Sequence, residues 1–317
     1  MRNRFALLLI GLSLFVSTEV WAQGKTDSRF PLFAYLTGTP TARVVTYAPS
    51  RLDPRSEANQ HTLKTSDIRA DLIVLRPTFD GLILYGYNEA CTPRILAIAK
   101  ALKYRAVILG VWDIKSRNEL MGAVTLANEY KDSMAIGLLI GNEGINFGRY
   151  EQEDLTVALE SVRAKLAPSI PIGTSEPLGR YDKKFVRSFG DFLAPNIHPV
   201  FDRPNMNPSE AAAWAREEAL KLMKTSGKPV LLKETGFPHD GKPAYTPESQ
   251  SAFWSAYLKP GAIVRGGGNW VFHGVAFEAF DLPWKSEASG LPIEKSWGLF
   301  SQARKPYPVL SAWIGLK

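Results

Sequence analysis

Two glutamates that follow apolar segments of the sequence are candidates for acid–base or nucleophilic chemistry. Glu143 comes shortly after the run 136–140, and Glu234 comes directly after the run 230–233. Burying a carboxylate is unfavourable unless it is paired or used, so each glutamate alone fits a buried salt bridge as well as a catalytic role. Two carboxylates that face one substrate can work together, one donating a proton to the leaving oxygen and the other attacking or activating water. Cleavage of a glycosidic bond needs this pair.

Short apolar segments, which alternate with amphipathic ones, are the elements that must position these glutamates. The candidate strands are 43–47, 81–85, 106–112, 135–141, 170–174, 192–197, 229–233 and 269–277, and the amphipathic stretches between them include 93–103, 117–131, 152–165, 209–226 and 247–258. Short apolar runs are typical of parallel strands that are buried on both faces, and alternation with helices builds right-handed βαβ units. The pattern predicts an α/β fold, a single-domain (β/α)₈ TIM barrel over residues 23–317. Glu143 and Glu234 would then lie at the C-terminal ends of strands four and seven, where such barrels place their chemistry.

A doubly wound open sheet is the alternative architecture. It usually carries a glycine-rich phosphate loop after its first strand, and the segment 46–49, Thr-Tyr-Ala-Pro, is not of that kind. The sequence therefore favours the barrel.

The N-terminus has the order of a signal peptide. Arg2 and Arg4 precede an apolar run of about 12 residues, which is shorter than a membrane-spanning helix, and Ala22 ends a small-residue cleavage site. We expect residues 1–22 to be removed and the mature chain to be exported, either periplasmic or secreted, without stable insertion in a membrane. A retained anchor is the alternative.

Composition narrows the classes of ligand. The net charge is +7, but the basic residues are scattered among acidic ones, and no nucleic-acid motif is present. The single cysteine, Cys91, excludes an intramolecular disulfide. The four histidines form no ligand pair at helical spacing, so no metal and no cofactor is expected. We expect a monomer whose partner is a β-glucan oligo- or polysaccharide.

Several short segments, in order from about Val44 to Phe300, resemble glycoside hydrolase family 17 in its bacterial type. They are Gly141-Asn142-Glu143, Glu234-Thr235-Gly236-Phe237-Pro238, Ser296-Trp297-Gly298-Leu299-Phe300, Leu84-Tyr85-Gly86 and Phe280-Asp281-Leu282-Pro283-Trp284-Lys285. The resemblance implies a retaining β-1,3-glucanase that forms a covalent glycosyl-enzyme, with Glu143 as general acid/base and Glu234 as nucleophile.

The resemblance also implies a substrate-binding set. Asn142 matches the position that hydrogen-bonds the sugar 2-hydroxyl, Tyr47 and Tyr85 match subsite tyrosines, and Glu278 matches an auxiliary acid. His198 stands where many relatives have tyrosine. Aromatic residues at strand ends, among them Trp112, could stack on glucose rings. The substrate-binding residues expected in full are Tyr47, Tyr85, Asn142, His198, Trp270, Glu278, Trp284 and Lys285.

Two other functions stay open at this point. A β-glucan transglycosylase would use the same two glutamates and pass the intermediate to a sugar hydroxyl, giving elongated, branched or cyclic glucans. A non-catalytic glycan-binding barrel would have no use for an activated carboxylate pair, so the two glutamates argue against it.

Overall fold

The computed structural model describes residues 29–316. The expected signal peptide, 1–22, lies outside the described residues. The strands are β1 (Val44–Thr46), β2 (Gly81–Ile83), β3 (Ala106–Val111), β4 (Ala135–Asn142), β5 (Ile172–Ser175), β6 (Val230–Leu231), β7 (Ile263–Gly266), β8 (Asn269–Phe272) and β9 (Val275–Ala276). The helices before β5 are α1 (Pro31–Thr37), α2 (Glu57–Thr62), α3 (Thr65–Leu75), α4 (Thr92–Ala101), α5 (Arg117–Tyr130) and α6 (Gln152–Arg163). Those after β5 are η1 (Leu178–Asp182), α7 (Lys184–Ser188), α8 (Pro199–Asp202), α9 (Pro208–Ser226), α10 (Pro247–Leu258), α11 (Pro283–Ser289), η2 (Pro292–Lys295) and α12 (Leu310–Ile314).

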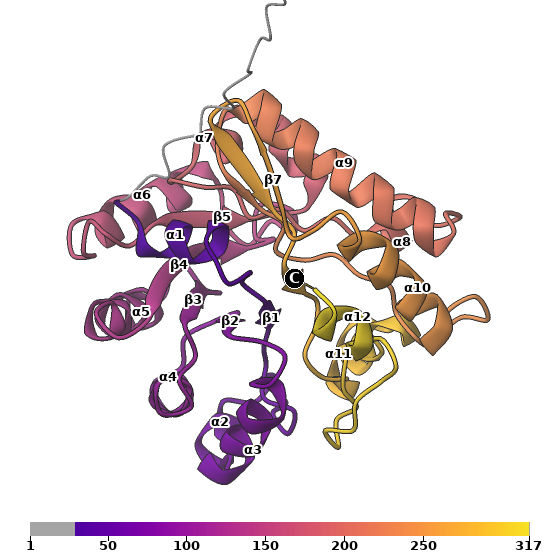
Figure 1. Ribbon diagram of the computed structural model, residues 1–317. Helices are drawn as coiled ribbons and strands as arrows, with labels where there is room; N and C mark the ends of the chain where they lie inside the picture. The colour runs from indigo at the N-terminus through magenta and orange to yellow at the C-terminus, as the bar shows by residue number, and fades with distance from the viewer. Residues whose placement is uncertain (1–28, 317) are drawn as a thin grey trace, which may run out of the picture.

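The strands form a ring whose neighbours are parallel, and only β7, outside this ring, is antiparallel to its partner among the described strands. One sheet has the order β5-β4-β3-β2-β1-β9, and a second has the order β6-β8-β7. Single bridges from the segment 193–196 join the two sheets, because Asn196 pairs with both Pro177 and Glu234 and Leu193 pairs with Val230. The helices surround these strands (Figure 1). The predicted (β/α)₈ barrel is therefore confirmed.

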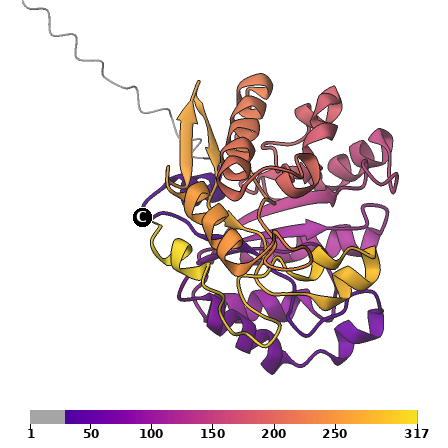
Figure 2. The same cartoon turned by 90° about the vertical axis from the view of Figure 1, so that its right-hand side faces the viewer.

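Two elements differ from the sequence prediction. The expected eighth strand, 269–277, is broken into β8 and β9, so that β8 pairs with β6 while β9 pairs with β1. The segment before it, which was not among the expected strands, contains β7, which pairs antiparallel with β8. The connecting Gly267 and Gly268 have φ of 58° and 81°, the left-handed region that a tight hairpin turn requires. Figure 2 shows this hairpin projecting beside α9.

The hydrophobic core has two parts. The larger lies between the strands and the outer helices, and the smaller fills the end of the barrel where the strands begin. Helix α1 covers that end: the Phe33 ring contacts Phe192 and Trp270, with ring centroids 5.9 and 5.1 Å away. The opposite end, where the strands finish, is thus the one left to carry polar side chains.

Within residues 29–316, no helix is both long and apolar enough to cross a bilayer.

Candidate active site

Glu143 is positioned by an irregularity at the end of β4. The pairing of β4 with β5 shifts register between Leu139 and Asn142, and Gly141 and Glu143 have φ of 84° and 56°. The Glu143 amide donates to the Ser175 carbonyl at 2.7 Å, which ties this turn to the end of β5. Left-handed backbone at a non-glycine residue is unfavourable and is common at functional sites. The turn aims the Glu143 carboxylate at the mouth of the barrel.

A second carboxylate holds the loop that follows Glu143. Glu176 is fully buried, and its oxygens accept hydrogen bonds from the amides of Ile145 and Asn146 and from the Tyr150 hydroxyl. The Tyr150 ring lies against Gly144, where a Cβ atom would come within 1.7 Å of the ring. Glu176 and Tyr150 therefore keep the acid-bearing turn in place.

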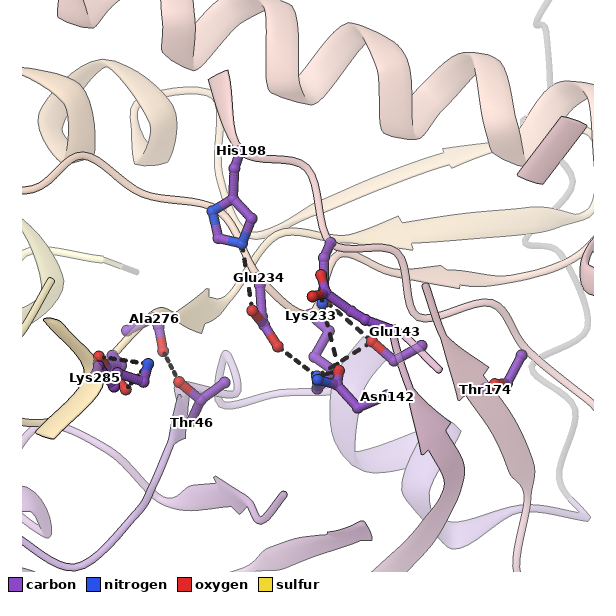
Figure 3. Close-up of polar contacts among 12 residues, drawn as sticks. Thr46, Asn142, Glu143, Thr174, His198, Lys233, Glu234, Ala276 and Lys285 are labelled. Atoms are coloured by element: carbon purple, nitrogen blue, oxygen red, sulfur yellow. Dashed lines mark hydrogen bonds and ion pairs between the residues drawn. The ribbon is translucent and has the colours of Figure 1, made fainter. Parts of the chain in front are cut away.

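Glu234 follows β6 and lies between Lys233 and His198. Its Oε1 atom accepts from Lys233 Nζ at 2.5 Å, and its Oε2 atom is 3.3 Å from Nε2 of His198 (Figure 3). The parallel bridge to Asn196 fixes the backbone of Glu234, and the carboxylate is 7% exposed. The second glutamate is thus a rigidly held, ion-paired carboxylate.

The side chains of Asn196, Asn142 and Lys233 lie between the two glutamates. Asn196 donates from Nδ2 to Oε1 of Glu143 at 2.8 Å, and Lys233 donates to Oδ1 of Asn142 at 2.5 Å. Figure 3 shows Glu143, Asn142, Lys233, Glu234 and His198 converging in one region. The side chains come from the end of β4, from the chain just after the bridged segment 193–196 and from the residues that follow β6.

The environment shifts the pKa values of the two glutamates in opposite directions. Burial, followed by the negative charge of Glu234, raises the pKa of Glu143 above its ordinary value of 4.5. Burial also opposes ionisation of Glu234, but the charge of Lys233 and the hydrogen bond and charge of His198 outweigh it and lower the pKa of Glu234 to about 2. Glu143 therefore keeps its proton to higher pH than an ordinary glutamate, and Glu234 loses its proton at lower pH. This difference suits an acid and a nucleophile, respectively.

Five of the eight expected substrate-binding residues lie around this pair. Asn142 and His198 contact it as described, and the Tyr85 ring lies under the Lys233 ammonium, 4.7 Å from Nζ to the ring centroid. Glu278 is buried just after β9, and both of its oxygens accept from Lys285 Nζ at 2.9 Å. Burial outweighs the Lys285 charge and raises the pKa of Glu278 to about 7.

Tyr47 is not part of this site, which corrects the sequence-based expectation. Its hydroxyl donates to Oδ2 of Asp71 at 3.0 Å, and Asp71 lies in the outer helix α3. Side chains of a strand alternate between its two faces, and it is the preceding residue, Thr46, that lies on the site's side in Figure 3. Tyr47 is 1% exposed and packs between the strands and the helices.

Tyr47→Phe is therefore expected to change stability and not substrate binding. Removing a buried hydrogen bond to a carboxylate should lower the free energy of unfolding by about 1.5–3 kcal/mol, while kcat/KM stays near the wild-type value. Denaturant unfolding and initial rates check the two quantities. Tyr104→Phe is the matched control, because the Tyr104 hydroxyl donates to the Leu72 carbonyl in the same layer. A large rise in KM with unchanged stability would return Tyr47 to the substrate site.

Trp270 is also outside the site. It lies at the beginning of β8, is 8% exposed and packs edge-to-face on Phe33 of α1, at the end of the barrel that α1 covers. Trp284 lies in the first turn of α11, half-buried, with an indole Nε1 that has no acceptor among the described residues. Its contact with sugar stays a prediction.

Three site residues were not expected from the sequence. Lys233, Asn196 and Ser175 are buried at the ends of their strands and link the two glutamates through hydrogen bonds. Lys233 carried a signal, since a lysine inside an apolar strand requires an acidic partner. Asn196 and Ser175 are ordinary polar residues at strand ends, and nothing in the sequence distinguished them.

The barrel and the glutamate pair define a class: a parallel (β/α)₈ barrel with the two carboxyl groups of a glycosidase at the C-terminal ends of its strands. A family model described as the BtgE/BtgC glycoside hydrolase domain matches residues 45–298. The chain belongs to this family, and its resemblance to glycoside hydrolase family 17 is confirmed.

Individual relatives agree with this assignment. The chain is 28% identical over 272 residues to the probable glucan endo-1,3-beta-glucosidase btgC of Aspergillus clavatus, covering 76% of this chain but only 38% of that protein. It is 24% identical over 273 residues to the glucan 1,3-beta-glucosidase of Saccharomyces cerevisiae, covering 77% of this chain and 85% of that one. These relatives are fungal, so the bacterial-type assignment stays a prediction.

The fold is shared with solved structures. The glycoside hydrolase family 17 beta-1,3-glucanosyltransferase from Rhizomucor miehei superimposes with a TM-score of 0.65 at 20% identity, covering 86% of this chain and 97% of that one.

Proposed function

We propose that this protein is a retaining glycosidase that cleaves β-1,3-linked glucan through a covalent glycosyl-enzyme. The observation that carries the proposal is the convergence of Glu143 and Glu234 at one end of the barrel, where Asn196 contacts the first and Lys233 the second. The opposite directions of their pKa shifts, raised at Glu143 and lowered at Glu234, agree with it. A protonated donor and an ionised nucleophile at one barrel mouth are what the first step of retention needs.

Each residue has a defined role in the two steps. In the first step a carboxylate oxygen of Glu234 bonds to the anomeric carbon while the glycosidic C–O bond breaks, and Glu143 gives its proton to the leaving oxygen. In the second step Glu143, now ionised, takes a proton from water. The resulting oxygen nucleophile bonds to the anomeric carbon, and the Glu234 carboxylate is released.

The substrate is proposed from the relatives. Two of them are named as 1,3-beta-glucosidases, and a related solved structure is a beta-1,3-glucanosyltransferase in complex with laminaritriose. The transferase supports transglycosylation as the second candidate, since a sugar hydroxyl can replace water in the second step. Export to the periplasm or the exterior belongs to the same proposal, because the sequence pattern of residues 1–22 is that of a signal peptide.

Incubation with a β-1,3-oligosaccharide of defined length tests the proposal. We expect shorter products, with the β-anomer appearing first in proton NMR spectra recorded before mutarotation. Longer products would assign transglycosylation, and an unchanged oligosaccharide that nevertheless binds would assign a glycan-binding barrel. An α-anomer appearing first would contradict retention.

A further inference from the structure

Lys233 is a buried cation whose hydrogen-bonding capacity is fully used inside the site. Its side chain is 1% exposed, and Nζ contacts three acceptors: Oε1 of Glu234 at 2.5 Å, Oδ1 of Asn142 at 2.5 Å and Oγ of Ser175 at 3.2 Å. An ammonium group has three N–H donors and no acceptor. Each donor of Lys233 is therefore matched to one atom of the site.

This donor-only group fixes the direction of the neighbouring hydrogen bonds. The Asn142 oxygen must face Nζ, so the Asn142 amide nitrogen points elsewhere, and it donates no hydrogen bond among residues 29–316. Because Ser175 Oγ accepts from Lys233, its own proton goes to Oδ1 of Asn196 at 3.0 Å. The Asn196 amide is thereby oriented so that Nδ2 donates to Oε1 of Glu143.

We propose that Lys233 is a positioning residue that keeps the Glu234 nucleophile ionised, binds its Oε1 atom so that Oε2 is the attacking oxygen, and orients the amides that contact both carboxyl groups. The inference rests on the proposed function, because it assigns Lys233 to the machinery of the same retaining reaction.

The assignment of the attacking oxygen follows from what surrounds each atom. Oε1 faces Nζ, which lies in the barrel interior and is itself inaccessible. Oε2 faces His198, whose Nε2 is 3.3 Å away and whose side chain is 13% exposed. A sugar ring that enters from the mouth of the barrel can reach Oε2 without displacing the lysine.

Charge supports the same role. Glu234 is 7% exposed, so burial opposes its ionisation. The charge of Lys233 opposes this effect of burial most strongly, and the hydrogen bond and charge of His198 add to it, so that the pKa of Glu234 is lowered to about 2. The other titratable groups that face this cluster are Glu143 from β4, Tyr85 after β2, Glu278 after β9, Lys285 in α11 and Glu294 in η2.

A purely structural lysine would affect folding without changing the ionisation of Glu234. Lys228 provides this matched control, because it precedes the same strand and its Nζ donates to the carbonyls of Ser188, Phe189 and Gly190. Lys233→Met removes a buried ammonium group, and Lys228→Met removes a half-buried one. Only the first should change the chemistry of the site.

The experiment follows the carboxyl resonance of Glu234 in protein labelled with ¹³C-glutamate, assigned by its loss in Glu234→Gln. Between pH 3.5 and 6 we expect it to stay at the ionised position in the wild type and in Lys228→Met. In Lys233→Met the midpoint should rise to 4.5 or above, because 4.5 is the ordinary pKa of a glutamate and burial raises this pKa further. A wild-type midpoint at or above 4.5, or an unchanged titration in Lys233→Met, would overturn the proposal. If Lys233→Met does not fold, a wild-type midpoint at or above 4.5 would still overturn the proposal.

Rates complete the test on the same proteins. Lys233→Met should lose about 10²–10³-fold in kcat/KM on the β-1,3-oligosaccharide, with its acidic limb moved to higher pH, while Lys228→Met keeps the wild-type profile. If the wild type cleaves and Lys233→Met keeps both its rate and its profile, the inference about Lys233 is wrong. If the wild type cleaves no β-1,3-glucan, the proposed function is wrong, and the substrate-free titration still reports on the lysine.

Discussion

Glu234→Ala is expected to lower turnover of a β-1,3-oligosaccharide by about 10⁵-fold or more, a loss typical of removing a catalytic nucleophile. The buried carboxylate of Glu234 is held by Lys233 and His198, which favour its ionised form, and it is the group proposed to form the covalent intermediate. Initial rates over long incubations measure the loss. Glu160→Ala, an exposed carboxylate of α6, is the control and should leave the rate unchanged.

Azide distinguishes a lost nucleophile from a lost fold. The space left by the Glu234 carboxylate lies beside the Lys233 ammonium group, which should attract the azide anion. With an activated aryl β-glycoside, added azide is expected to restore turnover and to yield the α-glycosyl azide, because a single displacement inverts the anomeric carbon. Near-wild-type activity without azide, or a β-azide product, would remove Glu234 from the role of nucleophile. Circular dichroism confirms that the variant is folded.

The fold and the two glutamates could be predicted because they depend on patterns that sequence carries directly. Apolar runs long enough for buried strands recur with amphipathic helices between them, and a carboxylate at the end of such a run is unusual enough to be noticed. The chain direction then puts Glu143 and Glu234 at the same end of the barrel. No knowledge of side-chain packing is needed for this step.

Tyr47 and Trp270 could not be placed in this way, for two different reasons. Tyr47 stands at the end of its predicted strand, but neighbouring strand residues point to opposite faces, and its side chain points toward α3. Its hydroxyl donates to Asp71, a contact that depends on the tertiary structure and is not visible in the sequence. Trp270 lies at the N-terminal end of its strand, opposite the mouth of the barrel. It begins β8, and the aromatic cluster around Phe33 of α1 buries it far from the mouth.

Lys233 was not predicted as a site residue, although its position in the sequence carried a signal. It stands inside the apolar run before Glu234, and its place next to a glutamate was visible. Adjacent strand residues point to opposite faces in a regular strand, so a contact between neighbours is not the default expectation. The strand β6 ends at Leu231, and the irregular backbone beyond it allows both side chains to meet.

The remaining large effect is expected for Glu143→Gln, and it should depend on the leaving group. With an unactivated oligosaccharide the variant cannot protonate the departing oxygen, so kcat/KM should fall by about 10²–10⁴-fold. With an activated aryl glycoside, whose leaving group needs no proton, the first step should stay near the wild-type rate. The second step should stall, because glutamine cannot take a proton from water. A burst of released phenol followed by slow turnover is the expected time course.

The pH profile gives the same substitution a second, independent readout. Burial and the charge of Glu234 raise the pKa of Glu143, so wild-type activity should persist above pH 4.5 and fall as pH rises through that raised pKa and the proton is lost. Glu143→Gln has no such proton, and its first step should show no alkaline limb from this group. Glutamine keeps the acceptor for Asn196 Nδ2, so geometry is preserved and charge is the only variable. Glu153→Gln on the exposed face of α6 is the control. Equal losses with both kinds of substrate, or an alkaline limb that survives the substitution, would assign the acid role to another residue.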